Sequence, residues 1–126
     1  MAKLKRQLTL ALHEGPGTDP EELAHLTGQL RRRLLELEVD SVDLARSYEA
    51  PPGAKLGDAL TIGALVVTAA PMVLRAVVGL VETWLSYRPL RGVTLTIDDD
   101  ALELTNASRA EQRHLVQAFI DRHARQ

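Results

Sequence analysis

The feature that most restricts the fold of this sequence is an apolar stretch at its centre, residues 57–87. The segment 59–74 contains no charged residue, and a helix that is apolar on nearly all sides must be covered on nearly all sides. We therefore expect this stretch to form the core and the flanking chain to cover it. Because Pro71 would cost about 3 kcal/mol inside a helix, we predict two helices, 59–69 and 71–87, with one kinked helix as the alternative.

The alternative interpretation of the same stretch is a membrane-spanning segment. Crossing the hydrocarbon takes about 20 predominantly apolar residues, whereas the uncharged run is closed by Asp58 and Arg75. It becomes long enough only if Arg75 is tolerated and the run continues to Val81. We therefore favour a buried core element, and the alternative is a membrane-associated component anchored by residues 59–81.

Length and composition set the class of protein. A chain of 126 residues is expected to form one domain, 1–126. With 45% apolar but only 3% aromatic residues, its core must be aliphatic. A net charge of -2 argues against nucleic-acid binding, which usually needs a basic face. The absence of cysteine excludes disulfides, and the mixed segment that follows Lys3 does not resemble a signal peptide, so we expect a cytoplasmic protein.

Alternation of apolar and polar residues predicts four strands. They are 3–12, 39–46, and a hairpin of 93–98 and 101–105 whose turn is the acidic run 98–100. The first two strands enclose a helix, an order that suggests a parallel pair with a right-handed crossover.

Two helices outside the central stretch have clear start signals. The first is capped by Asp19, followed by Pro20, with Glu22 three residues after the cap as in a capping box. The last begins at Ser108, with Glu111 in the equivalent place. Their predicted buried residues are Leu23, Leu26, Leu30, Leu34 and Leu37 in the first helix, and Leu115, Val116, Phe119 and Ile120 in the last.

These elements predict a two-layer α/β (α+β) sandwich, in which a four-stranded mixed sheet carries the helices on one face. The expected order is β-α-β-α(α)-β-β-α. The polar side of the strands would then be left uncovered, as a wet surface or a docking surface. Its residues would be Lys5, Gln7, Thr9, Asp43, Thr94, Thr96, Glu103 and Thr105. We expect Trp84 to lie in the core, with a role as a partner anchor as the alternative.

The sequence contains no residue pattern that identifies a catalysed reaction. The four histidines lack the spacing of a helical zinc site, and 98–100 reads as an acidic turn. No phosphate loop or nucleophile elbow is present. We expect no enzyme activity, cofactor or metal. The one constellation that keeps a small ligand-binding domain or enzyme as an alternative is His13-Glu14, at a strand end where α/β sheets often place ligands.

The order of these features resembles a known family. They are the amino-terminal strand, the loop 52–57 before the apolar stretch, the break near Pro71, the helix ending in Thr83-Trp84-Leu85, and the strand 93–97 followed by an acidic turn and a terminal helix. In this order the chain resembles the effector-associated constant component family of bacterial conflict systems. The resemblance implies a non-enzymatic adaptor or regulator, encoded beside effectors such as caspase-like or trypsin-like peptidases.

We therefore expect a cytoplasmic protein-interaction component whose partner is an effector protein encoded nearby. A homodimer is a further expectation, because an aliphatic central helix often leaves a patch that two-fold pairing buries. The predicted partner-binding residues are Lys5, Gln7, Thr9, Asp43, Trp84, Thr94, Thr96 and Glu103.

Overall fold

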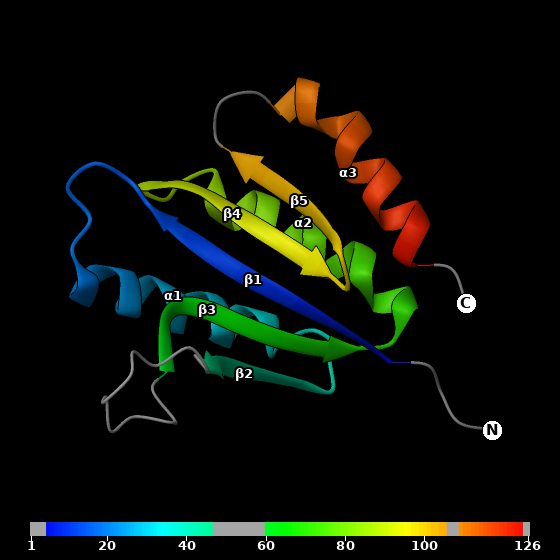
Figure 1. The fold of residues 1–126 in the computed structure, drawn as a ribbon, viewed down its shortest axis with the longest axis horizontal. Coiled ribbons are helices and arrows are strands. Elements are labelled where there is room, and N and C mark those ends of the chain that lie inside the picture. The colour runs from blue at the N-terminus through cyan, green and yellow to red at the C-terminus, as the bar shows by residue number, and fades with distance from the viewer. Residues whose placement is uncertain (1–4, 47–59, 106–108, 125–126) are drawn as a thin grey trace.

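The computed structural model describes residues 5–46, 60–105 and 109–124 (Figure 1). The elements are β1 (Arg6–Glu14), α1 (Pro20–Leu34), β2 (Ser41–Arg46), β3 (Leu60–Ala69), a 3-10 turn η1 (Pro71–Val73), α2 (Leu74–Leu85), β4 (Leu90–Ile97), β5 (Asp100–Thr105) and α3 (Arg109–His123). The loop predicted at 48–57 and the cap predicted at Ser108 lie outside the described residues.

The strands form one five-stranded sheet in the order β2-β3-β1-β4-β5, and every neighbouring pair is antiparallel. Figure 1 shows α1 and α2 behind the sheet, with α3 alongside β5. The α+β class is thus confirmed. The predicted four-stranded mixed sheet is wrong, since the sheet has a fifth strand and contains no parallel pair among the described strands.

The fifth strand is β3, which occupies the segment 60–69 where we predicted a helix. Leu65 and Val67 are fully buried toward the helices, while Val66 and Thr68 alternate onto the opposite side and are half-buried. An interior strand covered in part on both faces reads as a continuous apolar run. That run does not distinguish a buried strand from a buried helix by periodicity. Pro71 then ends the strand region and opens η1 and α2.

The predicted parallel pairing of the first two strands is also wrong. β3 inserts between β1 and β2 and is antiparallel to both. The two strands therefore run in the same direction but do not touch. The chain returns later to fill the gap, which strand-helix-strand order alone does not reveal.

The first helix has the predicted cap. The Asp19 side chain accepts a hydrogen bond from the Glu22 amide at 2.8 Å, and Pro20 is the first helical residue. The predicted leucine stripe is buried up to Leu34, and Leu37 packs against the core just beyond the helix end. The predicted hairpin of β4 and β5 is present, but its turn is shorter than the predicted 98–100, since Asp100 already pairs with Ile97 and Asp98 lies in the turn at a φ of 54°.

The last helix buries a narrower stripe than predicted. Val116, Phe119 and Ile120 are buried, but Leu115 is 60% exposed. α3 packs mainly along β5 and one side of α2, so Leu115 lies on its open side. Leu44 is likewise 42% exposed, because β2 is an edge strand that the helices cover incompletely.

Candidate functional site

The face of the sheet opposite the helices is the candidate site, and the strand registers fix its members. Residues directly opposite each other in antiparallel strands share a face. Thr9 of β1 lies between Val66 of β3 and Thr96 of β4, and Ala11 lies between Ala64 and Thr94. We call this surface the open sheet face. Its residues are Gln7, Thr9, Ala11, His13, Ser41, Asp43, Ala64, Val66, Thr68, Gly92, Thr94, Thr96, Ala101, Glu103 and Thr105.

The structure brings most of the predicted site residues together on this face. They are Gln7, Thr9, Asp43, Thr94, Thr96 and Glu103, and Thr105 joins them. Lys5 precedes β1, and its Nζ reaches across to Asp40 Oδ1 at 3.1 Å. Trp84 alone lies elsewhere, on α2 within the helical layer, where it is 6% exposed.

The centre of the open sheet face is lined by short side chains. Thr9, Thr94 and Thr96 are half-buried, and Ala64 is 7% exposed. Longer and charged side chains stand at the margins, with Asp43 on the edge strand β2 and Glu103 on the other edge strand β5. The result is a surface of hydroxyl and methyl groups with a carboxylate at each side.

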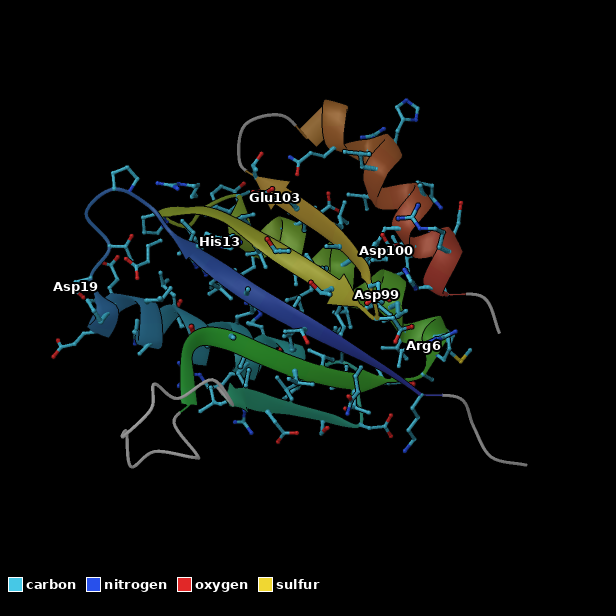
Figure 2. All side chains as sticks on the ribbon, in the orientation of Figure 1. Arg6, His13, Asp19, Asp99, Asp100 and Glu103 are labelled. Carbon is cyan, nitrogen blue, oxygen red and sulfur yellow. The ribbon has the colours of Figure 1, made fainter. Side chains whose placement is uncertain are left out.

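His13, which we predicted just beyond the end of the first strand, lies within β1 and is a member of this face. Its Nε2 lies 2.6 Å from the Thr94 hydroxyl oxygen. Glu103 is the cross-strand partner of Thr94, and Figure 2 shows His13 and Glu103 near the same end of the sheet. The parity of Gln7 and Thr9, continued past Leu12, would have found it. Ala64, Val66 and Thr68 were missed for another reason, since their segment was predicted to be helical.

Both outer edges of the sheet are bonded to helical side chains. Arg31 of α1 donates from Nε to the carbonyl oxygen of Val42 in β2 at 2.8 Å. Gln112 of α3 makes two bonds with the main chain of Thr105 in β5. It accepts from the amide at 2.8 Å and donates to the carbonyl oxygen at 2.8 Å. These contacts occupy backbone groups that another strand would otherwise use for pairing.

Trp84 lines a groove between α1 and α2 of about 420 Å³. The Arg88 guanidinium lies 5.0 Å from its ring centroid, which is a favourable distance for a cation–π contact. The indole Nε1 is buried and has no hydrogen-bond partner within the described part of the chain. The other lining residues are Arg33, Gly79, Leu80, Thr83 and Tyr87. Trp84 is thus mainly a core residue, with one side at a groove.

The acidic turn forms a separate cluster at the other side of the molecule. Asp100 Oδ2 accepts hydrogen bonds from Arg122 Nε at 2.7 Å and from His123 Nε2 at 2.6 Å, and Figure 2 places Asp100 beside the end of α3. The Arg122 bond first, and then the His123 bond, lower the pKa of Asp100 below its usual range. Across residues 5–46, 60–105 and 109–124, no three histidine or acidic side chains are grouped to hold a metal ion.

No protein-family model, curated protein or solved structure matches the chain. Within the described ranges, no helix has both the length and the apolar character to cross a membrane. The fold and the site together define the class, an α+β domain with helices on one face of a five-stranded antiparallel sheet and an open opposite face.

Proposed function

We propose that this chain is a non-enzymatic protein-interaction component that binds a partner protein on the open sheet face. From the resemblance in sequence, we propose as partner an effector encoded nearby, such as a caspase-like or trypsin-like peptidase of a bacterial conflict system. The observation that carries the proposal is that the described helices cover one face of the sheet, while no described element covers the other.

The composition of this face suits docking. Alanine loses no side-chain entropy when it is buried, and the β-branched Thr9, Thr94 and Thr96 are already restricted in χ1. Covering such residues therefore costs less ordering entropy than covering lysine or glutamate. Their methyl groups supply apolar area, and their hydroxyls supply hydrogen bonds at modest desolvation cost.

The two edge strands indicate which surface the partner binds and what charge the partner carries. The contacts of Arg31 and Gln112 at the two edges disfavour the addition of a partner strand, so the face is the better surface. Asp43 and Glu103 flank that face. The complementary partner surface carries lysine or arginine at its sides.

The test places a long charged side chain at the centre of the face. Thr96→Arg should lower the affinity for the effector by about 100-fold, because a buried charge without a partner costs several kcal/mol. Ala118→Arg is the matched control, since it adds the same side chain at an exposed position of α3. The measurement is co-purification and calorimetry with the protein encoded by the neighbouring gene, after circular dichroism has shown both variants to be folded.

Two outcomes would reject the proposal. One is that no effector-type protein binds the unaltered chain. The other is that Thr96→Arg and Ala118→Arg bind the effector equally well.

A further inference from the structure

The outward side of α2 is unusual for a helix at a protein surface. Its buried side packs into the core through Leu74, Val77, Val78, Val81, Trp84 and Leu85. The opposite side consists of Ala76, Gly79 and Thr83, with Met72 of η1 before the helix and Tyr87 just after its C-cap Ser86, and we call these five residues the outer α2 face. It contains no charged residue.

Two large side chains on this face are open to solvent. Met72 is 75% exposed and Tyr87 is 82% exposed, while Ala76 and Thr83 between them are also exposed. A helix that faces water normally shows charged or polar residues on that side. The outer α2 face therefore has the character of a covered surface.

The spacing of these residues is symmetric. Met72 and Tyr87 are equally far from the midpoint between Gly79 and Leu80, and so are Ala76 and Thr83. We propose that two copies of this chain pair through their outer α2 faces, antiparallel and about a two-fold axis near Gly79. Met72 then lies against the partner's Tyr87, and Ala76 lies against the partner's Thr83. A self-complementary patch of this kind is what a two-fold interface requires.

Glycine 79 sets how closely the two helices approach. A Cβ added there meets no atom within 4 Å in the single chain, so its absence is not required by the fold of one copy. Helix axes pack about 8–10 Å apart, and the residues at the contact decide the distance. The small residues Ala76, Gly79 and Thr83 suit the short end of that range.

The charges at the margin also complement each other. Arg75 and Glu82 both line the groove of about 530 Å³ between α2 and α3, so they share one side of the helix. In the antiparallel pair this side meets the same side of the partner. Arg75 then falls about two residues, or about 3 Å along the axis, from the partner's Glu82. The two-fold axis repeats that ion pair.

The expected dimer is weak. α2 (Leu74–Leu85) spans about 18 Å at 1.5 Å per residue, so contact through this helix alone buries less than the standard interface of about 1,600 Å². A dissociation constant on the order of micromolar fits such an area. The pairing is independent of the partner on the open sheet face, which lies on the other side of the molecule.

The first experiment measures self-association of the full chain by sedimentation from about 1 µM to about 1 mM, the range in which weak dimers dissociate. Gly79→Glu places two like charges at the axis and should weaken the dimer about 100-fold or more. Gly28→Glu is the matched control. Gly28 is also a helical glycine with open space around it. It precedes Arg31 by three residues and therefore lies on the side of α1 that faces β2.

A charge exchange checks the orientation. Arg75→Glu or Glu82→Arg alone should weaken the dimer about three- to ten-fold, and the double exchange should restore it. A parallel pair would not show this recovery.

A cross-link gives a readout that does not depend on affinity. Because the sequence has no cysteine, a single introduced cysteine can bond only to another copy. Gly79→Cys should oxidise readily to a covalent dimer, since disulfides need Cα atoms within about 7 Å, and Gly28→Cys should not. A chain that stays monomeric to about 1 mM, or a dimer that Thr96→Arg disrupts and Gly79→Glu leaves intact, would overturn the inference.

Discussion

At the scale of single residues, Asp100 connects the β4–β5 turn to the last turn of α3. Its carboxylate accepts hydrogen bonds from Arg122 and His123, and these bonds hold the pKa of Asp100 below its usual range. A carboxyl whose pKa is lower in the folded state adds stability above its unfolded pKa of about 3.9. That stability is lost as the pH falls through the folded pKa.

Replacing this carboxylate should therefore change the acid side of the stability profile. We predict that Asp100→Asn lowers the free energy of unfolding at neutral pH and flattens its fall with acid below about pH 4. Urea unfolding at a series of pH values measures both effects. Asp99→Asn, at the exposed neighbour in the same turn, is the control, and equal profiles for the two variants would contradict the assignment.

At the scale of elements, β3 shows what sequence patterns do not resolve. Val66, Val67 and Thr68 are β-branched and favour a strand, but the uncharged run around them suits a buried helix equally well. Only the pairing with β1 and β2 decides between the two. The amphipathic elements were predicted well because one side of each faces water. α1 was placed by its Asp19 cap, and the β4–β5 hairpin by its alternation.

Gly63 of β3 has a left-handed backbone and lies against Leu23 of α1. Its φ is +85°, and a Cβ there would lie 3.0 Å from Leu23 Cδ2. We predict that Gly63→Ala destabilises the fold by about 1–3 kcal/mol, because the left-handed backbone is costly for alanine and Leu23 must move. Gly28→Ala, in an uncrowded part of α1, should instead be neutral or stabilise by up to about 1 kcal/mol. Chemical unfolding compares them, and equal stabilities would refute the role of Gly63.

At the scale of the whole molecule, strand parity predicted part of the candidate site. Thr9, Thr94 and Thr96 were placed correctly on one face because each strand alternates. The part of that face formed by Val66 and Thr68 was not predicted, because these residues belong to β3, which we predicted to be a helix. A patch on the central apolar helix was expected from the sequence, but its residues were not. Only the packing of α1 and α3 shows which side of α2 they leave exposed.

The helical side chains that bond the two edge strands are expected to protect the protein from aggregation. β2 and β5 end the sheet, and an unprotected edge strand favours pairing between molecules. Gln112 satisfies the amide and the carbonyl of Thr105 at one of these edges. We predict that Gln112→Leu costs about 1–2 kcal/mol of stability, since it removes two hydrogen bonds. It should also speed aggregation into β-rich assemblies.

The matched control uses the same substitution on the same helix. Gln117→Leu removes an exposed glutamine that donates to Asp121 of α3 and accepts from Arg75 of α2, but contacts no strand through these bonds, so it adds equal apolar surface without freeing an edge. Turbidity and thioflavin fluorescence at equal concentration and equal fraction folded separate the two effects. If Gln112→Leu aggregates no faster than Gln117→Leu, the Gln112 contact only attaches α3 to β5 and does not protect the edge strand from intermolecular pairing.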